Sequence, residues 1–449
     1  MNLMSPVESM MLLAESPGHP MHVAGLQLFR PPQNAGPEFV RDFHGAIRGC
    51  DDVQPLFRRQ PTTLPGGLVS GWSSAAEVDL DYHVRRSAIP GPGRVRELLE
   101  LVSRLHSATL DRHRPLWETH VIEGLRDGRF AVYTKLHHAL VDGVAAINLL
   151  QDSLSSDPAD PQVRAPWALP APDADLSGGT SKLRALTGAL TALPGLGAST
   201  LGLARAALLE QQMTLPFQAP STMLNVPIGG ARRVAAQSWP LERIKNVKNA
   251  AGVTVNDVVL AMCSGALRAY LADQAALPEK QLVAMVPVSL RTAGDAPGGN
   301  QAGAVLAGLA TDVDDPAERL AAISASMKKN KEIVAQMPKQ QAVALGMMLL
   351  SPVVLGGMTG ISTSPPPFNV CISNVPGART PLYANGARLE GSYPMSIAAN
   401  GQALNITLVG NGDTLDFGLV GCRRAVPHLQ RLLDHLETSL KALEQAVGV

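Results

Sequence analysis

Charged and aromatic residues are both scarce in this 449-residue sequence. Asp, Glu, Lys and Arg make up 17% of it, and Phe, Trp and Tyr only 4%, whereas an average soluble domain has about 25% charged residues. Lys plus Arg equals Asp plus Glu at 38 each, and no long basic run is interleaved with aromatics. Because binding to a phosphate backbone depends on such basic patches, the composition argues against nucleic acid as a partner. The low charge instead predicts a rather apolar surface.

Cysteine is scarce too, with four residues far apart and no C-x-x-C pair. They are Cys50, Cys263, Cys371 and Cys422, each in or beside an apolar or small-residue segment. This pattern favours reduced, buried thiols over disulfides or metal ligands. The N-terminus lacks a basic region before its apolar stretch and carries Glu8 and Glu15 within it. It therefore does not look like a secretory signal, and the cytoplasm is the expected location.

Several motifs that mark common enzyme classes are absent. The sequence has no G-x-S-x-G elbow, no Walker A loop, no G-x-G-x-x-G and no H-E-x-x-H. No cluster of His, Cys and carboxylates has metal-ligand spacing, so neither a metal nor a cofactor is predicted, and no covalent nucleophile stands out. What remains is direct attack of an acceptor hydroxyl on a thioester, which needs one base, one oxyanion donor and an apolar tunnel.

The candidate base lies in the segment HHALVDG at 137–143. The β-rich run FAVYTKL at 130–136 predicts a strand that leads directly into the two histidines. Since consecutive side chains on a strand point to opposite faces, His137 and His138 cannot share one role. His138 would lie on the apolar face, where an imidazole suits general-base catalysis near neutral pH. We predict His138 as the base and His137 as a neighbour that shapes the site; an ordinary strand end with two polar residues is the alternative.

Asp142 and Gly143 follow the histidines at the start of the next predicted helix. Apolar residues recur at helical spacing from residue 144 onward. Asp142 either caps this helix or orients the histidine loop through a buried ion pair with an arginine from elsewhere, and both roles can hold together. Gly143 allows a tight turn between strand and helix.

The length predicts two domains, because a single hydrophobic core rarely grows beyond about 250–300 residues. Strand-like and helix-like runs alternate in both halves, which indicates an α/β (α+β) mixture. A stretch rich in Pro, Asp, Ser and Gly separates them. We predict one domain at 1–160, a crossover linker with apolar helices at 161–225 and a second domain at 226–449. In that second domain we expect helices at 253–272 and 427–447, and strands at 282–289, 368–373, 404–409 and 415–420.

Two apolar stretches bear on membrane contact. Residues 342–362 carry no charge and nearly reach the length of a membrane-spanning helix, but Pro352 and four glycines favour a buried or interfacial helix pair. Residues 183–209 contain only Arg184 and Arg205 as charges. The two stretches predict contact with the surface of a bilayer or lipid droplet rather than a membrane span.

The chain resembles the bacterial wax ester synthase/diacylglycerol acyltransferase family over nearly its whole length. HHALVDG matches the family's HHxxxDG, and several further segments agree in order and spacing, which is far more specific than HHxxxDG alone. These are PMHVAGLQLF (20–29), PLWETHVIEGL (115–125, the PLW signature), TVNDVVLAMCSGALRAYL (254–271, the ND motif), VPVSLR ending at Arg291, and CISNVPG (371–377, the NVP motif).

The resemblance implies two chloramphenicol acetyltransferase-like domains, each a mixed β-sheet flanked by helices, with an active-site tunnel at their interface. In related acyltransferases the motif's second histidine is the base and its aspartate is paired with an arginine. Those roles fall on His138 and Asp142 here, with Arg291 chosen as the arginine because it follows a buried strand. Asn256 of the ND motif either supplies an amide near the oxyanion or caps its helix, and Asp257 is expected to be structural.

The expected activity is transfer of a long-chain acyl group from acyl-CoA, a substrate rather than a cofactor, to a fatty alcohol, with diacylglycerol as a second acceptor. Peripheral association with the inner membrane or lipid droplets is expected, and a homodimer is compatible with the sequence. Two alternatives stay open. One is a noncatalytic lipid-binding or droplet-coating protein on the same fold, and the other is acyl transfer to a different small alcohol or an amine.

Overall fold

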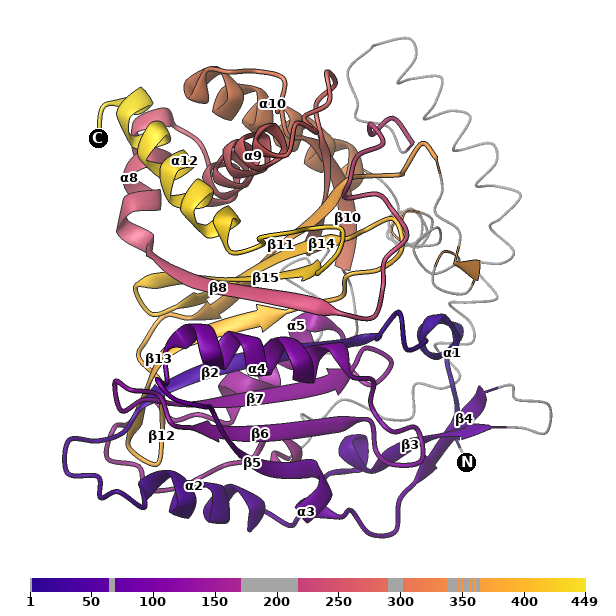
Figure 1. The fold of residues 1–449 in the computed structure, drawn as a ribbon, viewed down its shortest axis with the longest axis vertical. Coiled ribbons are helices and arrows are strands. Elements are labelled where there is room, and N and C mark those ends of the chain that lie inside the picture. Colours follow the sequence, from indigo (N-terminus) through magenta and orange to yellow (C-terminus); the bar gives the residue numbers. More distant parts are fainter. Residues whose placement is uncertain are drawn as a thin grey trace.

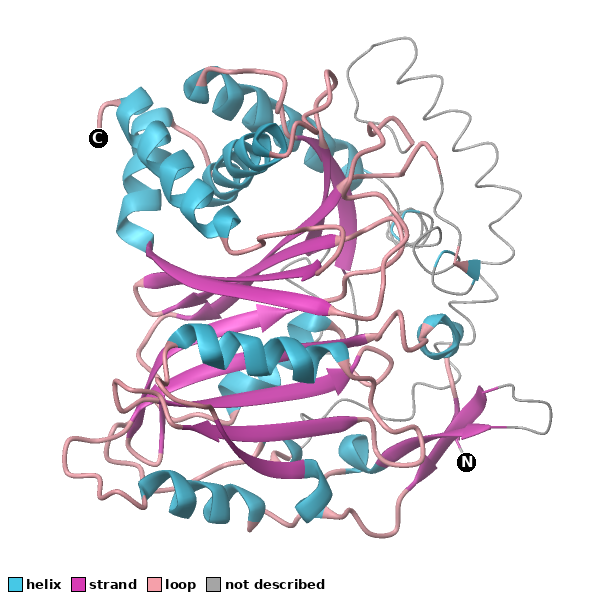
Figure 2. Ribbon diagram, in the orientation of Figure 1, coloured by secondary structure: helices cyan, strands magenta, loops and turns pink. Residues whose placement is uncertain are grey.

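The structure is a computed structural model that describes residues 2–63, 69–170, 217–289, 302–336 and 364–449, with 346, 349, 356 and 359–360 in between. This part of the chain forms two six-stranded sheets and a small three-stranded sheet. The two large sheets lie one above the other in Figure 1, and Figure 2 shows that the helices of the C-terminal half gather on the outer side of the upper sheet. We call the large sheets the N-terminal and the C-terminal sheet.

The N-terminal sheet has the strand order β12-β13-β2-β7-β6-β5, with β7 near its centre. Its neighbours are antiparallel except for the parallel pair β5 and β6. Helices α2 and α5 pack on one face and α4 on the other, because they contact alternate residues of the same strands. The elements are β2 (His22–Arg30), α2 (Phe39–Arg48), η1 (Pro55–Arg58), α3 (Leu80–His83), β5 (Val84–Ala88), α4 (Val95–Ser107), β6 (Trp117–Glu123), β7 (Phe130–His137), α5 (Gly143–Asp152), η2 (Pro166–Ala168), β12 (Tyr383–Ala384) and β13 (Ala387–Met395). The small sheet contains β1 (Asn2–Leu3), β4 (Val69–Ser74) and β3 (Arg59–Thr63), and α1 (Pro6–Ala14) follows β1.

The C-terminal sheet has the order β10-β9-β11-β14-β15-β8 and is also mixed, since β11 runs parallel to both β9 and β14. In the described residues, helices α8, α9, α10 and α12 cover its outer face and enclose a large hydrophobic core (Figure 1). The elements are β8 (Arg232–Pro240), α8 (Leu241–Ala251), α9 (Val255–Asp273), β9 (Val283–Ser289), β10 (Ala302–Gly308), α10 (Pro316–Gln336), β11 (Val370–Ala378), β14 (Leu404–Asn411), β15 (Thr414–Cys422) and α12 (Arg431–Val447).

Eight of the strands and helices predicted from residue patterns are confirmed with shifted ends. The strand predicted at 130–136 is β7, and the helix predicted from 144 onward is α5. The six elements predicted in the second half correspond to α9, β9, β11, β14, β15 and α12. Alternation and helical periodicity therefore identify the elements whose burial is regular.

One hairpin crosses between the two halves. β12 and β13 lie at 383–395, within the predicted second domain, yet β13 pairs with β2 at the edge of the N-terminal sheet. The register joins Met395 to Ala24 and Arg388 to Arg30. Such pairing is non-local and leaves no mark in the periodicity of either segment, so the predicted domain ranges do not contain it.

The start of the predicted linker packs into the N-terminal half. Trp167 is fully buried and stacks on Trp117 with ring centroids 4.8 Å apart, and its carbonyl accepts a hydrogen bond from Gln54 N at 2.8 Å. Residues 161–170 are thus part of the folded core on this side. The rest of the predicted linker up to residue 216 lies outside the described residues.

Helix α4 joins the two halves by packing along β8, the edge strand of the C-terminal sheet. The hydroxyl oxygens of Ser103 and Ser107 accept hydrogen bonds from the backbone N–H groups of Val234 and Arg232, at 3.0 and 2.8 Å. β8 is an edge strand, whose free N–H groups need partners when they are covered. On the other side of the molecule α5 packs on β11 of the C-terminal sheet. The segment that follows the histidines therefore lies at the interface between the halves.

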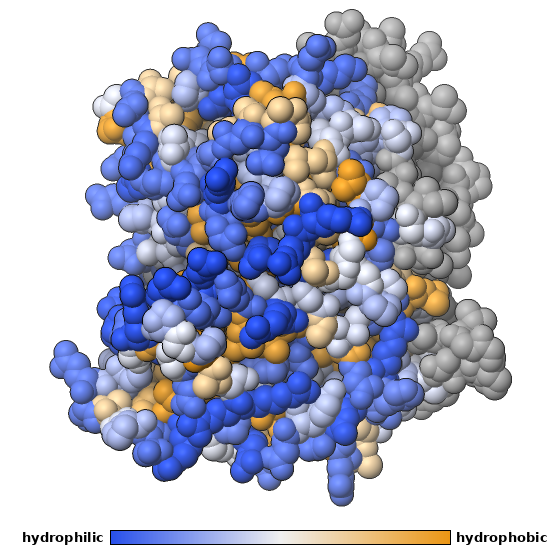
Figure 3. Space-filling view, in the orientation of Figure 1, coloured by the Kyte–Doolittle hydropathy of each residue, from blue (hydrophilic) through white to orange (hydrophobic). Residues whose placement is uncertain are grey.

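The visible surface is more polar than the composition predicts. Figure 3 shows a mainly hydrophilic face with small hydrophobic areas. Within the described ranges, the large exposed hydrophobic side chains are Leu13, Val95, Val144, Phe217 and Val449. The apolar stretch 183–209 lies outside the described residues, as does nearly all of 342–362. An apolar surface therefore stays a prediction for those stretches only.

Two buried features belong to the core. Helix α9 is long and apolar enough to cross a bilayer, but 67% of its most apolar 18-residue stretch is buried inside the protein, as in a core helix. The four cysteines are free thiols, as predicted; Cys263 and Cys422 are buried and the other two are half-buried. Burial raises the pKa of the Cys263 thiol to about 12, so it is a packing residue rather than a nucleophile.

Candidate active site

The HHALVDG segment forms the end of β7 and the turn into α5. β7 ends at His137 and α5 begins at Gly143. Backbone groups hold the strand end from two sides, because His137 N donates to Leu116 O at 3.0 Å and His138 N donates to Met21 O at 2.9 Å. Leu116 belongs to the PLW segment and Met21 to the PMHV segment. Three segments that lie far apart in the sequence therefore meet at the histidines.

The two histidines occupy different environments. His137 is fully buried, on the face of β7 that also carries Lys135. Its Nδ1 accepts a hydrogen bond from Ala139 N at 3.0 Å, and its Nε2 lies 3.4 Å from Glu15 Oε1. His138 is half-buried at the first position after the strand. Burial lowers the pKa of His138 from its usual value near 6.5, and the attraction of Asp142 offsets only part of that effect. His138 is therefore neutral at neutral pH and able to accept a proton.

Asp142 is the N-cap of α5. Its Oδ1 accepts a hydrogen bond from Ala145 N at 2.8 Å, and its backbone is extended, as caps require. The capping role predicted for Asp142 is thus present. Arg291, the arginine expected to pair with it, lies outside the described residues, so that ion pair stays a prediction.

Gly143 has a different setting from the predicted one. It is the first residue of α5, its φ is not positive, and an added Cβ would meet nothing within 4 Å. The turn itself therefore does not require glycine here. The chain turns between β7 and α5 at residues 138–142, before Gly143.

The ND motif lies apart from the histidines. Asn256 and Asp257 are in the first turn of α9, in the helical layer outside the C-terminal sheet (Figure 1). Asp257 forms a capping box with Thr254, whose N donates to Asp257 Oδ2 at 2.9 Å, and Ser324 of α10 also donates to Asp257 Oδ2, at 3.2 Å. The N-cap of α9 is Thr254, not Asn256. In the described chain no hydrogen bond or ion pair joins Asn256 to the histidine loop, so a role near the oxyanion stays a prediction.

The tryptophan of the PLW segment fixes the strands beneath the loop. Trp117 is fully buried, and its Nε1 donates to Phe57 O at 2.9 Å. Its ring stacks between Trp167 and the His83 ring, whose centroid is 4.4 Å away. Leu116, the residue next to it, accepts the hydrogen bond from His137 N, so this aromatic packing anchors the backbone to which the end of β7 is bonded.

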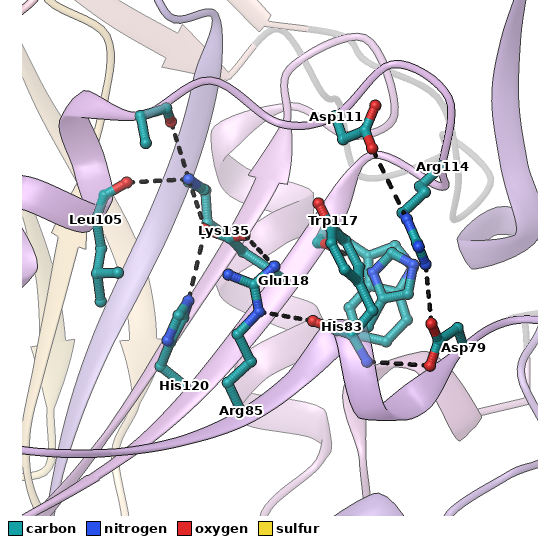
Figure 4. A network of polar contacts seen from close by, with 12 residues as sticks. Asp79, His83, Arg85, Leu105, Asp111, Arg114, Trp117, Glu118, His120 and Lys135 are labelled. Atoms are coloured by element: carbon teal, nitrogen blue, oxygen red, sulfur yellow. Dashed lines mark hydrogen bonds and ion pairs between the residues drawn. The ribbon is translucent and has the colours of Figure 1, made fainter.

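A buried ionic network lies on the same face of β7 as His137 (Figure 4). The Nζ atom of Lys135, fully buried, is 2.6 Å from Glu118 Oε1 and donates to the carbonyls of Leu105 and Ala108 at 2.9 Å each. These carbonyls belong to the C-terminal end of α4, where a cation is favourable. His120 and Arg85 lie near the Glu118 carboxylate, each with a closest nitrogen to oxygen distance of 3.5 Å. The network thereby ties α4 to β6 and β7 beside the active-site loop.

Two charged residues at the site were missed by the reasoning from sequence. Glu15 and Arg112 form an ion pair behind His137, with Arg112 Nη2 3.1 Å from Glu15 Oε2. The only local signal is an acidic residue in the otherwise apolar run MMLLAES at 10–16. Nothing near Arg112 in the sequence indicates its partner, which is 97 residues away.

A separate cleft lies at the opposite end of β7. A cavity of about 1140 Å³ opens between the halves and is lined by Leu28, Arg129, Leu98, Lys245 and Arg388, among others. Arg129 precedes β7, whereas His137 ends the strand and His138 follows it, and a strand of this length spans about 24 Å. The cleft therefore does not contain the candidate base, and the predicted tunnel at His138 stays a prediction. In the described part of the chain no group of three or more His, Cys, Asp and Glu side chains is arranged to hold a metal ion.

Models of one acyltransferase family match both halves of the chain. Residues 4–259 match the wax ester synthase/diacylglycerol acyltransferase catalytic domain, and residues 298–444 match the C-terminal domain of the same family. The chain is 61% identical over 448 residues to a putative diacylglycerol O-acyltransferase of Mycobacterium tuberculosis, covering 99% of the chain and 100% of the relative. It is 40% identical over 462 residues to an O-acyltransferase of Acinetobacter baylyi, covering 100% and 98%.

Solved structures confirm the predicted two-domain acyltransferase fold. The wax ester synthase/diacylglycerol acyltransferase from Marinobacter aquaeolei VT8 superposes with a TM-score of 0.80 at 42% identity and covers the whole of both chains. The starter condensation domain of rhizomide synthetase has a TM-score of 0.61 at 14% identity, over 100% of this chain and 94% of that domain, and shares the fold. Because the catalytic-domain match alone spans more than half of the chain and the relatives align over its full length, the chain belongs to the wax ester synthase/diacylglycerol acyltransferase family.

Proposed function

We propose that this acyltransferase moves a long-chain acyl group from acyl-CoA to the hydroxyl of a fatty alcohol, giving a wax ester, and to diacylglycerol, giving triacylglycerol. The observation that carries the proposal is the setting of His138. His138 is half-buried, its lowered pKa leaves the imidazole neutral at neutral pH, its backbone N–H is held by Met21 O, and α5, which follows the histidine loop, packs on β11 of the other half. A neutral imidazole fixed in this way suits the removal of a hydroxyl proton.

The proposed reaction needs one proton acceptor and no covalent enzyme intermediate. His138 takes the proton of the acceptor hydroxyl as its oxygen bonds to the thioester carbonyl carbon. The tetrahedral intermediate then expels the CoA thiolate, and the imidazolium of His138 returns its proton to that sulfur. The products are an ester and free CoA, and the base is regenerated. Asp142 keeps the start of α5 in place beside the base through its cap on Ala145, and Arg291 and Asn256 stay proposed partners by virtue of their motifs alone.

The substrate class is tested with the purified protein, palmitoyl-CoA and either hexadecanol or a diacylglycerol dispersed in detergent. We expect thiol release that depends on the acceptor, together with the ester product by thin-layer chromatography. Ethanolamine and a short alcohol serve as the competing acceptors. Thiol release with the amine alone would favour amide formation, and no release with any acceptor would favour a noncatalytic lipid-binding protein.

The pH dependence of kcat/KM follows from the lowered pKa of His138. A base must be neutral, so activity should fall as the pH drops through the pKa of His138, with a midpoint below about 6.5. Asp142 raises that pKa, so Asp142→Asn, which keeps a capping side chain, should move the midpoint further down. Initial rates between pH 4.5 and 8 measure both profiles. A midpoint above 7, or an upward shift in the variant, would contradict the assignment.

We also propose that the protein acts at the inner membrane or at lipid droplets, and as a homodimer. The support is chemical: the proposed acceptors are insoluble in water, and the apolar stretches 183–209 and 342–362 offer contact area. Flotation with phospholipid vesicles or triolein droplets should carry the protein upward, and sedimentation velocity should give twice the monomer mass. Protein that stays at the bottom of both gradients, or sediments as a monomer, would count against the respective proposal.

A further inference from the structure

Glu15 lies behind the histidine loop and uses both carboxylate oxygens. It is the C-cap residue of α1, and its side chain is only 2% exposed. Oε1 accepts a hydrogen bond from Met21 N at 3.3 Å and lies 3.4 Å from His137 Nε2. Oε2 accepts from Nε and Nη2 of Arg112, each at 3.1 Å. One buried carboxylate thus connects the N-terminal helix, the segment before β2 and the end of β7.

Two of these contacts lie next to the candidate base. Met21, whose N–H Glu15 binds, accepts the backbone N–H of His138 through its own carbonyl at 2.9 Å. His137, the residue before the base, binds the N–H of Ala139, the residue after it, through Nδ1. Glu15 therefore contacts the two groups that hold the backbone on either side of His138.

The charge of Arg112 completes the arrangement. Burial would raise the pKa of Glu15, but the interaction with His137, the charge of Arg112 and the hydrogen bond from Met21 N outweigh it and lower the pKa. Glu15 is thus ionised at neutral pH, and its bonds to Arg112 are charge-assisted. Arg112 also donates to Leu12 O at 2.5 Å, where the last turn of α1 leaves carbonyls without helical partners. Arg112 therefore holds both the carboxylate and the helix that presents it.

The hydrogen bonds also determine which nitrogen of His137 carries the proton. Ala139 N–H donates to Nδ1, so Nδ1 must be an acceptor without a proton. In the neutral ring the proton is then on Nε2, which faces Glu15. A neutral acceptor or an empty space at position 15 would remove the charge that favours this tautomer.

We propose that Glu15 and Arg112 are positioning residues for the acyl transfer: through His137 and Met21, this ion pair holds the backbone on both sides of His138. The inference rests on the proposed role of His138 as the base. A catalytic group displaced by about 1 Å can lose roughly 10²-fold in rate. Loss of the ion pair should therefore reduce kcat more than it changes KM, since neither residue is expected to contact acyl-CoA.

The test uses the full-length protein with Glu15→Gln, Arg112→Gln and the double variant. We expect each single variant to lower kcat about 10- to 100-fold, with KM for palmitoyl-CoA changed less than about threefold. The double variant should lose no more than the worse single variant, because the two residues act as one unit. Arg112→Lys keeps the charge but not the two-nitrogen contact with Glu15, and should retain intermediate activity. If Arg112→Gln does not fold, the Arg112→Lys variant is used in its place.

A matched ion pair controls for a purely structural effect. Arg243 of α8 and Glu437 of α12 form an ion pair with a closest distance of 3.0 Å, in the C-terminal half away from the histidines. Glu437→Gln should lower the melting temperature without lowering kcat measured below melting. Full kcat in Glu15→Gln, or an equal loss of kcat in Glu437→Gln, would overturn the proposal.

A second readout separates this inference from the proposed function. Nitrogen-15 NMR of histidine-labelled protein, assigned with His137→Ala, should show His137 protonated at Nε2 in the wild type and a changed tautomer mixture in Glu15→Gln. If the wild type releases no thiol with any acceptor, the proposed function fails, and the NMR result still decides whether Glu15 orients His137. An unchanged His137 spectrum in Glu15→Gln would refute the positioning role whatever the activity.

Discussion

Replacing His138 with alanine is expected to lower kcat/KM for acyl transfer about 10²- to 10⁴-fold, the usual contribution of a general base. The imidazole is the group placed to take the hydroxyl proton, and alanine leaves neither a base nor a proton donor for the thiolate. The backbone hydrogen bond from residue 138 to Met21 O survives the change, so the loop should keep its conformation. Thiol release with palmitoyl-CoA and hexadecanol measures the loss.

Two controls make the His138 result specific. His113→Ala removes an exposed histidine from the loop before β6 and should leave the rate unchanged. His138→Gln restores a polar side chain of similar size without a basic nitrogen, and should be nearly as inactive as the alanine variant. Activity within about tenfold of the wild type in His138→Ala would be incompatible with general-base catalysis by this residue. If neither the wild type nor His138→Ala releases thiol, a noncatalytic protein is favoured.

The histidine loop is predictable from sequence because its determinants are local. Alternation along FAVYTKL specifies a strand with two faces, and that alone separates His137 from His138. Asp142 before a helical pattern identifies the start of α5, and the structure shows the expected cap on Ala145. These inferences need no knowledge of the rest of the chain.

The remainder of the site depends on contacts between distant segments. Met21, Leu116 and Glu15 reach the histidines only after β2, β6 and α1 have assembled around β7. A lone acidic residue such as Glu15 in an apolar run indicates burial with a partner, but it does not say which partner. For the same reason the pairing of β13 with β2 could not be read from either strand.

At the start of the predicted linker, amino-acid composition gives the wrong expectation about burial. Residues 157–170 are rich in Pro and Asp and look like an exposed loop, yet Trp167 within them is fully buried against Trp117. A single large aromatic outweighs its polar neighbours, since a buried tryptophan removes roughly 150–250 Å² from water. Tryptophan in a polar stretch is therefore a better guide to packing than the average composition.

The largest expected loss of stability comes from replacing Lys135 with methionine. Lys135 is fully buried, and its ammonium group is 2.6 Å from Glu118. Methionine fills the space of the stem but leaves the Glu118 carboxylate, 9% exposed, without its closest cation. Removing one partner of a buried ion pair costs about 3–5 kcal/mol, and urea unfolding at pH 7 should show a loss of that size.

The pH dependence of stability distinguishes this pair from ordinary packing. Burial raises the pKa of Glu118, but His120 and Lys135 outweigh it and hold the pKa at about 2. Because this folded-state pKa is below the unfolded value near 4.5, the stability from Glu118 is present above pH 4.5 and is lost as the pH falls toward 2. Burial lowers the pKa of Lys135 despite the attraction of Glu118, so the pair as a whole contributes less than Glu118 alone suggests. The double variant Lys135→Met/Glu118→Leu should therefore recover part of the stability and show a shallower loss in acid.

An exposed ion pair provides the control for Lys135→Met. Arg96 and Glu100 lie one turn apart on α4 with side chains 75% and 44% exposed, and Arg96→Met should cost less than about 1 kcal/mol. If Lys135→Met costs no more than Arg96→Met, the buried network does not stabilise the fold. If the expected loss is found, activity should also decline before global unfolding, because Lys135 holds the end of α4 through Leu105 and Ala108. The loop that follows α4 contains Arg112, the cation that holds Glu15 behind the histidines.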